Sequence, residues 1–397
     1  MKIFQVNASY GRGSTGSICE EIKKYLESLG HECVVYYGNY SSDRAAIRMT
    51  SSFGVKCHSL LARLFGLGGY YSSAPTRRLI ADIRRERPDA VHLHNLHGNY
   101  INVPMLLRAL KSMHVRTVIT LHDCWFFTGK CTHYTAAGCN GWLHECGRCP
   151  LLRAEVPSYI FDRTKKMLRD KRDIYDGFNE LAVVAVSDWI YWEAKRSILA
   201  KNDIVRIYNW IDTEVFYPRN VEKHDGFNIL CVSAEWASDM TKYQDLIRLA
   251  ELVGDECKIM MVGRVAEGLI PPANVHVIPF VSDKNEMARI YSSADVYVHL
   301  SREDSFGKVI TEALACGTPS IVYDSTACPE LVGDGCGYSV PVGDVDAVCA
   351  AIEEIRANSK SVYSDKCVEF VRQFDKESLL EQTMALYEKK IKGSLDQ

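Results

Sequence analysis

The chain has 397 residues, of which 47% are apolar and 24% charged, and its formal net charge is −3. This length suits two domains of ordinary size, and the composition is typical of a soluble globular protein. No apolar run approaches the roughly 18 residues of a membrane-spanning helix. The first residues also lack the charged start, apolar core and cleavage site of a secretion signal. We therefore expect a cytoplasmic location.

The net charge conceals an asymmetry along the chain. Residues 1–205 carry 28 Lys and Arg against 19 Asp and Glu, whereas residues 206–397 carry 19 against 31. The densest basic run, residues 163–172, also contains Met167 and Leu168, so it could lie on an anionic membrane surface. A solvated helix face is the interpretation we favour. Nucleic acid is not an expected partner, because no nucleic-acid module accompanies the charge.

The first half alternates short β-rich runs with helical stretches. Strands are predicted at residues 2–7, 32–37, 90–94, 116–121 and 181–186, and helices at 17–29 and 75–87. This alternation predicts an α/β fold with a parallel sheet and helices on both faces. After the first strand, Gly11, Gly13 and Gly16 form a loop whose amides could receive a phosphate or a sugar hydroxyl. No acidic residue ends the second strand, so a dinucleotide fingerprint is not indicated.

Histidines follow two of the predicted strands. His94 ends the strand at 90–94 and His97 follows it, and His122 and Asp123 follow the strand at 116–121. Sheets of this kind bind ligands at the carboxyl ends of their strands. A single histidine is most often structural, and His122 is the one that we expect to contact substrate.

Four cysteines follow this second strand: Cys131, Cys139, Cys146 and Cys149, within a cysteine-rich segment at 124–150. A chain without a secretion signal keeps most cysteines as thiols. The cluster therefore predicts a closed, structural zinc site that pins a long loop. The spacing C-x7-C-x6-C-x2-C is not that of a standard zinc finger, so disulfides and free thiols remain alternatives.

The second half repeats the alternation. Strands are predicted at 228–233, 257–262, 275–278, 296–300 and 319–323, and residues 219–226 are interpreted as a linker. Two doubly wound units facing a central cleft are therefore expected. Asp344 and Asp346 spell a D-x-D, but Asp344 precedes an apolar-periodic run and is predicted to be a helix N-cap.

Residues 301–319 (SREDSFGKVITEALACGTP) lead from the strand at 296–300 through an acidic loop into a helix. A helix N-terminus presents unpaired N–H groups and partial positive charge, which suit a diphosphate. Gly307 would let the ligand approach the backbone, and Lys308 adds a positive charge. Asp304 and Glu312 could hold the two ends of a nucleotide-sugar. The alternative is an ordinary charged loop before a buried helix.

This segment resembles the E-x7-E motif of retaining glycosyltransferases of family 4, which have the two-domain GT-B fold. Glu312 and the following Ala313, Ala315, Gly317 and Pro319 match the motif, and Asp304 stands at its first acidic position. The resemblance implies Rossmann-like domains at 1–205 and 206–375 and a C-terminal helix at 376–397 that crosses back to the first domain. Because Asp replaces the usual Glu, either Glu303 or Asp304 could face the donor sugar.

The resemblance also assigns roles by position. It implies catalytic roles for His122, Lys242, Glu303 and Asp304. It implies donor binding by Gly16, Arg264, Phe280, Ser305, Phe306, Gly307, Lys308 and Glu312. Lys242 occupies the place of the family's phosphate-binding lysine, but Ala234-Glu235-Trp236 lacks the family's arginine, which leaves Arg264 and Lys308 as substitutes.

The implied function is that of a retaining, metal-independent glycosyltransferase that moves a hexosyl group from a UDP- or GDP-linked donor. The implied acceptor is a growing polyprenyl-diphosphate-linked glycan at the inner face of the cytoplasmic membrane, reached by peripheral association. The run H-N-L-H-G is similar to relatives that build bacterial surface polysaccharides of the colanic acid, capsule or exopolysaccharide type. Alternatives are a sugar-nucleotide epimerase or hydrolase of the same fold, and a non-catalytic subunit that binds nucleotide-sugar.

Overall fold

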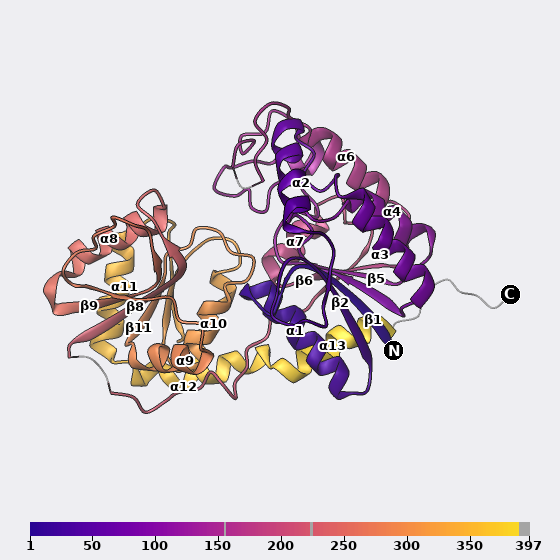
Figure 1. Cartoon of the computed structure of the whole chain (residues 1–397). Coiled ribbons are helices and arrows are strands. Elements are labelled where there is room, and N and C mark those ends of the chain that lie inside the picture. Colours follow the sequence, from indigo (N-terminus) through magenta and orange to yellow (C-terminus); the bar gives the residue numbers. More distant parts are fainter. Residues whose placement is uncertain (155, 223–224, 389–397) are drawn as a thin grey trace. The chain divides into compact units, whose positions relative to one another are not determined.

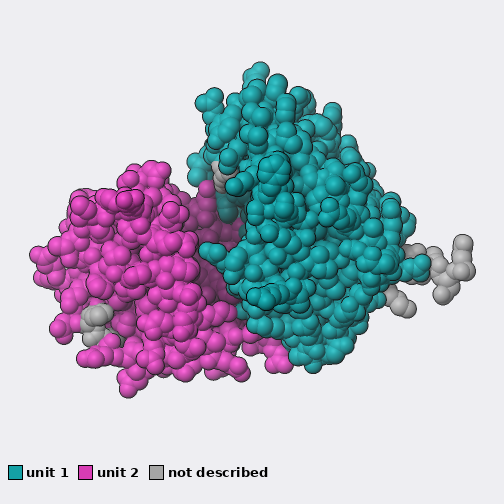
Figure 2. Space-filling model, viewed as in Figure 1, with its two compact units in different colours: residues 1–208, 380–397 teal, residues 209–379 magenta. Residues whose placement is uncertain are grey.

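The computed structural model describes residues 1–154, 156–222 and 225–388 (Figure 1). The chain divides into two units, which Figure 2 colours separately. Unit 1 contains residues 1–208 and the segment that begins at Leu380, and unit 2 contains residues 209–379. Each unit is built around one parallel sheet, as the βα alternation predicted.

The described residues of unit 1 form a seven-stranded sheet in the order β3-β2-β1-β4-β5-β6-β7. All residues of the three strands β4, β5 and β6 are buried, as expected for parallel strands covered on both faces. The chain order reverses between β1 and β4, and such a switch point is where α/β sheets bind ligands. The strands are β1 (Lys2–Tyr10), β2 (Glu32–Ser41), β3 (Ile47–Arg48), β4 (Ala90–Leu93), β5 (Thr117–Leu121), β6 (Leu181–Ala185) and β7 (Asp203–Arg206).

The helices of unit 1 correct one expectation and argue against one alternative. Helix α1 begins at Gly13, so Gly16 lies in its first turn and not in a loop before it. The basic run forms most of α6, but its Met167 and Leu168 are each 1% exposed, so they pack inside the unit and offer no apolar face to a membrane. These helices are α1 (Gly13–Ser28), α2 (Ser52–Phe65), α3 (Ser73–Glu86), α4 (Val103–Ser112), α5 (Gly141–His144), α6 (Thr164–Tyr175) and α7 (Asp188–Lys195).

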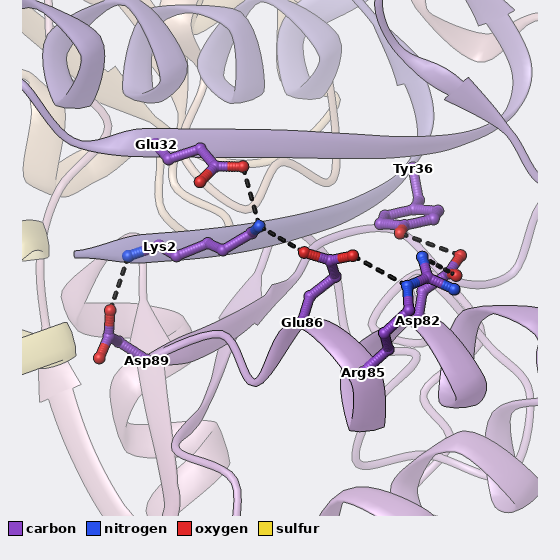
Figure 3. A network of polar contacts seen from close by, with 7 residues as sticks. All are labelled: Lys2, Glu32, Tyr36, Asp82, Arg85, Glu86 and Asp89. Carbon is purple, nitrogen blue, oxygen red and sulfur yellow. Dashed lines mark hydrogen bonds and ion pairs between the residues drawn. The ribbon is translucent and has the colours of Figure 1, made fainter.

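A polar network holds together the amino ends of β1 and β2 and the end of α3 (Figure 3). The Lys2 Nζ lies 3.0 Å from Glu32 and 2.7 Å from Glu86, and the Lys2 amide donates to Asp89. Arg85 continues the network from Glu86 to Asp82. Ion pairs as accessible as these stabilise a protein by little, so we assign the network a structural role at the edge opposite the carboxyl ends.

The described residues of unit 2 form a six-stranded sheet in the order β10-β9-β8-β11-β12-β13, the strand order of a dinucleotide-binding Rossmann sheet. Its switch point lies between β8 and β11. The strands are β8 (Phe227–Trp236), β9 (Cys257–Val265), β10 (Val275–Ile278), β11 (Val296–His299), β12 (Ser320–Tyr323) and β13 (Gly337–Val340).

Helices connect these strands, and short 3₁₀ turns interrupt the chain at Gly254–Glu256, Pro329–Leu331 and Val371–Phe374. The predicted N-cap is confirmed, because Asp344 Oδ1 accepts the Ala347 amide at 2.9 Å. None of the described helices is both long and apolar enough to cross a bilayer. The helices of unit 2 are α8 (Thr241–Val253), α9 (Lys284–Ser293), α10 (Lys308–Ala315), α11 (Val345–Asn358) and α12 (Ser361–Phe370).

The last described helix, α13 (Lys376–Glu388), starts in unit 2 and ends in unit 1. Within unit 1, the Tyr387 hydroxyl lies 2.7 Å from Nδ1 of His92, and Arg116 Nε donates to the Leu386 carbonyl at 2.9 Å. The C-terminal helix that the resemblance implied is therefore present up to Glu388. The rest of the predicted segment, 389–397, lies outside the described residues.

Candidate active site

A cavity of about 240 Å³ opens at the switch point of the unit 2 sheet. Its walls come from the carboxyl ends of β8 and β11, the start of α8 and the loop that leads to α10. Lys242, His299 and Asp304 provide its ionisable side chains, with Ser233 and Ser301 beside them. The parallel sheet thus brings together residues that are up to 71 positions apart in sequence, because both strand ends lie at one edge.

Lys242 is half-buried at the beginning of α8 and points toward β8. Its Nζ donates to Ser233 Oγ at 2.5 Å and lies 5.7 Å from the ring centre of Trp236. Burial lowers the pKa of Lys242, whereas the carboxylates of Asp304 and Glu235 act to raise it. A partly desolvated cation gains from an incoming anion, so this position suits a phosphate.

Asp304 is held by a chain of hydrogen bonds that starts in the sheet. The Tyr297 hydroxyl lies 2.8 Å from Nδ1 of His299, and Nε2 of His299 lies 2.7 Å from Oδ2 of Asp304. Burial raises the pKa of Tyr297 far above its usual range, so its hydroxyl keeps its proton and donates. With Nδ1 of His299 accepting from that hydroxyl, Nε2 donates to Asp304, which fixes the orientation of the Asp304 carboxylate.

Cys328 adds a third metal-capable side chain to this place. Its Sγ and the ligand atoms of His299 and Asp304 all lie within 4.8 Å of one another. The direct bond between His299 and Asp304 and the neighbouring Lys242 ammonium favour binding of an anion here over a cation.

Helix α10 follows the cavity loop. Gly307 is its N-cap, with φ at 79°, a left-handed conformation that favours glycine. Ser305 and Phe306 are buried, and the Phe306 ring packs edge-on against Phe374 at 5.6 Å. The helix starts at Lys308, so Asp304 precedes it. Glu312 lies within it and accepts a hydrogen bond from Tyr291 at 3.1 Å.

Other sequence-selected residues of unit 2 lie away from the cavity walls. Arg264, near the end of β9, places its guanidinium 4.8 Å from the ring centre of Phe280, and both residues are exposed. Glu303 and Lys308 do not line the cavity. Among the described lining residues, Lys242 is the only Lys or Arg, so neither proposed substitute for the missing arginine is part of the wall.

Unit 1 carries a second polar cluster, at its own switch point. Gln5 on β1 donates from Nε2 to the Cys19 carbonyl, and its Oε1 lies 3.0 Å from Nε2 of His94. His94 must therefore donate there and accept at Nδ1, which lies 3.1 Å from Nε2 of His122. His122 then donates through Nε2 and keeps Nδ1 as an acceptor.

These histidines are held neutral. Burial lowers the pKa of His122 to about 4, that of His92 to about 3, and that of His94 well below its usual range. Nearby, Asp123 is engaged by His97 at 2.8 Å and by the Trp125 amide. His97, His122 and Asp123, picked from the sequence, do come together, but Gln5 was not foreseen because it lies inside a buried strand.

Gly16 contributes through its backbone. Its carbonyl accepts the Gly11 amide at 2.9 Å, and a Cβ at this position would lie 3.3 Å from the Ser9 carbonyl oxygen. Asn7 reinforces the same corner, because its side chain donates to Ser9 and Thr15 and accepts from Asn95. No pattern in the sequence indicates a role for Asn7, which lies within an ordinary strand pattern.

Comparison with known proteins identifies the family. Residues 15–215 match the family model described as Glycosyltransferase Family 4, and residues 219–373 match that of Glycosyl transferases group 1. The chain belongs to glycosyltransferase family 4. It is therefore a glycosyltransferase, as the motif at 301–319 indicated.

Two curated relatives span most of this glycosyltransferase. It is 25% identical over 365 residues to the putative colanic acid biosynthesis glycosyl transferase WcaC of Escherichia coli K12, covering 87% of this chain and 88% of that protein. It is 23% identical to the N-acetyl-alpha-D-glucosaminyl L-malate synthase of Bacillus anthracis, covering 85% and 82%.

Solved structures share the fold. Sucrose-phosphate synthase from Thermosynechococcus elongatus aligns with a TM-score of 0.69 at 14% identity, covering 98% of each chain. Anabaena Alr3699/HepE in complex with UDP aligns with a TM-score of 0.64 at 15% identity, covering 98% of this chain and 100% of that one. The predicted GT-B fold, with two Rossmann-like domains, is confirmed.

Proposed function

We propose that this glycosyltransferase binds a nucleoside-diphosphate sugar at the unit 2 cavity and transfers its sugar with retention and without a catalytic metal. The proposed acceptor is a lipid-linked glycan in the synthesis of a bacterial surface polysaccharide. The observation that carries this proposal is the pairing of Lys242 with an oriented Asp304 at the switch point of a Rossmann-like sheet.

The first step is release of a nucleoside diphosphate, which develops negative charge as the glycosidic bond breaks. Lys242 stabilises that charge from the cavity wall. Lys308 and the amides at the start of α10 supply further positive potential. Because the leaving group is stabilised by a lysine and a helix terminus, the reaction needs no divalent cation.

Asp304 orients the donor sugar, since a fixed carboxylate can accept hydrogen bonds from its hydroxyls. Glu312 binds the ribose diol, and the backbone around Phe280 meets the base. The nucleoside is proposed to be uridine, because Anabaena Alr3699/HepE is described in complexes with UDP and UDP-glucose. Arg264, stacked on Phe280, is available at the edge of this region.

From unit 1 we assign a catalytic role to His122. Its Nε2–H donates to Nδ1 of His94. The other ring nitrogen, Nδ1, can therefore accept a hydrogen bond from a sugar hydroxyl. No second carboxylate is assigned as a nucleophile, and the acceptor hydroxyl attacks on the face that the diphosphate leaves. Retention follows from that same-face displacement.

The acceptor assignment rests on charge and on a relative. Residues 1–205 have an excess of nine positive charges, which suits a polyprenyl-diphosphate-linked glycan presented at the inner face of the cytoplasmic membrane. WcaC is named for colanic acid biosynthesis, a surface-polysaccharide process. We propose peripheral association through this charge.

The test measures transfer of labelled sugar to lipid-linked acceptors, after thermal stabilisation has selected the donor from a panel of NDP-sugars. Lys242→Ala and Glu312→Ala should each lower kcat by about 100-fold or more, whereas the exposed Lys258→Ala on β9 should not. Added Mg²⁺ or Mn²⁺ should leave the rate unchanged.

Three outcomes would contradict the proposal. A folded Glu312→Ala variant with full activity would remove the assigned donor site. Epimerised donor, or rapid release of free sugar without acceptor, would indicate an epimerase or a hydrolase. Donor binding without turnover on any acceptor would indicate a non-catalytic nucleotide-sugar-binding subunit.

A further inference from the structure

A small cavity is enclosed by the four cysteines of the segment between β5 and α6. Apart from the short α5, the described residues of this segment form irregular backbone. Cys131, Cys139, Cys146 and Cys149 line a space of about 20 Å³, together with Trp142 and other side chains. A space of this size holds roughly one water-sized particle, so the fold places four cysteines around a volume suited to a single ion.

Hydrogen bonds orient two of the four sulphur atoms. The Gly129 amide donates to Cys146, the Leu151 amide donates to Cys149, and the Cys131 thiol is hydrogen-bonded to Cys149. Amide donors of this kind are typical outer partners of metal-binding sulphur atoms. All fifteen cysteines lie within the described residues, and none forms a disulfide.

Two buried lysines flank the cluster. Lys171 is 3% exposed, donates to the Trp125 and Thr128 carbonyls, and interacts electrostatically with Cys146, Cys131 and Asp123. Lys130 is 4% exposed and donates to three carbonyls, those of Leu152, Ala154 and Val156. Buried ammonium groups are unfavourable unless negative charge lies nearby.

Asp162 lies near Lys130 and Asp123 lies near Lys171, and a tetrathiolate zinc centre would add further negative charge beside both lysines. Four thiolates and one Zn²⁺ carry a net charge of about −2, which the two lysines balance. The four sulphur atoms surround their cavity at a wider spacing than His299, Asp304 and Cys328, the one described trio with ligand atoms within 4.8 Å of one another. Zinc binding would draw the sulphur atoms inward to about 2.3 Å from the ion.

We propose that Cys131, Cys139, Cys146 and Cys149 bind one structural zinc ion, with Lys130 and Lys171 as its counter-charges. Each cysteine loses its thiol proton to solvent and forms one Zn–S bond, so four bonds form and four protons are released. With four protein ligands the site has no open position and takes no part in sugar transfer. Because the segment has little regular secondary structure, the ion would hold its backbone in one conformation next to α6. The proposal is independent of the proposed donor and acceptor.

The first experiment measures metal in the purified full-length protein by mass spectrometry. We expect about one zinc per chain in the wild type and at least a fivefold reduction in Cys146→Ser and Cys139→Ser. Cys349→Ser is the matched control, because Cys349 is also half-buried but lies on α11, and it should retain full zinc. Co²⁺ exchange should give tetrahedral thiolate absorption that both cluster variants lack.

Lys171→Met tests the counter-charge without removing a ligand. It should weaken zinc binding by about tenfold or more in competition with a chelator, as loss of an outer partner does at other zinc sites. Zinc removal should increase hydrogen exchange of the described amides in 122–163 and leave unit 2 unchanged.

Any of three results would overturn the proposal. The first is less than a tenth of an equivalent of zinc in wild-type protein with four alkylatable thiols. The second is an intact protein mass lower by two hydrogen atoms for each disulfide, which would show that the cysteines of the cluster are oxidised. The third is equal zinc in Cys146→Ser and Cys349→Ser.

Discussion

Asp304 depends on His299 for its orientation, and His299 in turn depends on Tyr297. The hydroxyl of Tyr297 and the imidazole of His299 are buried, whereas the Asp304 side chain is one-third exposed to the cavity. A carboxylate supported from behind in this way keeps one geometry while ligands come and go. We therefore regard His299 as a positioning residue for the donor sugar.

Substitutions along this chain should have graded effects on transfer. Asp304→Asn should lower kcat by about 100-fold, because the amide cannot replace a charged acceptor. Tyr297→Phe should lower kcat by about tenfold with little change in KM, because His299 remains but is less well oriented. Steady-state kinetics with the selected donor measure both.

The control compares two substitutions of His299, one that keeps a hydrogen-bond donor and one that does not. His299→Gln keeps a donor toward Asp304 and should retain more activity than His299→Phe, although both remove the imidazole. Equal activity in the two variants would show that His299 has only a packing role.

At residue scale, the family resemblance selected Asp304 and Lys242, which the structure places in the wall of one cavity, but it did not select His299. A histidine at a strand end usually has a structural role, and its bond to Asp304 arises because the loop at 300–303 turns back on the strand. No spacing rule predicts that turn. The missing family arginine was noticed, yet its replacement could not be located from sequence.

Among elements, α10 follows the acidic loop as the sequence indicated. The helix starts at Lys308 after a left-handed Gly307, so Asp304 lies in the loop and Glu312 in the helix. A Cβ on Gly307 would lie 2.8 Å from Cδ1 of Ile310, so this position is limited both by φ and by space. The turn sets where the α10 amides point.

Gly307→Ala should therefore destabilise unit 2 by about 1–3 kcal/mol, through backbone strain and the Ile310 contact together. Urea denaturation measures the change in the free energy of unfolding. Gly268→Ala is the matched control in unit 2, because Gly268 has φ at 81°, close to that of Gly307, but no atom within 4 Å of the added Cβ. If the two variants lost equal stability, the Ile310 contact would contribute nothing.

The buried strands were the most predictable elements. Every residue is buried in the short strands β4, β5, β11 and β12. The bounds of each were predicted to within one or two residues. The edge strands β3, β7 and β13 were not predicted, because their residues are partly exposed and they gain their structure from neighbouring strands. These strands form because they pair with neighbouring strands in the folded sheet.

For the whole molecule, the neutral histidines of unit 1 link stability to pH. Near neutral pH, His92 and His122 are uncharged in both the folded and the unfolded chain. As the pH falls below about 6.5, both histidines become protonated in the unfolded chain. In the folded chain they stay neutral until the pH reaches their lowered pKa values, about 4 for His122 and about 3 for His92. The free energy of unfolding should then fall by up to about 1.4 kcal/mol per pH unit for each histidine.

Hydrogen exchange of the β4 and β5 amides between pH 7.5 and 4.5, corrected for the intrinsic exchange rate, measures this slope. His92→Gln should flatten it, because one such histidine is removed. The exposed His276→Gln, on β10, should leave it unchanged. The same slope in both variants would show that the buried histidines do not control acid stability.

The architecture was predictable as two parallel α/β units because alternation of elements is a local property of the sequence. The partners of the C-terminal helix were not. His92 and Tyr387 are separated by 295 residues, and neither has a pattern that indicates the other. Long-range pairs of this kind follow from the finished topology.

Helix α13 has a consequence for the order in which the protein is made. Residues 380–388 complete the buried interior of unit 1, yet they leave the ribosome after all of unit 2. The hydroxyl partner of His92 is therefore absent while unit 2 is being synthesised. Until residues 380–388 are synthesised, part of the interior of unit 1 stays uncovered. Unit 1 is therefore translated first but completes its folding last.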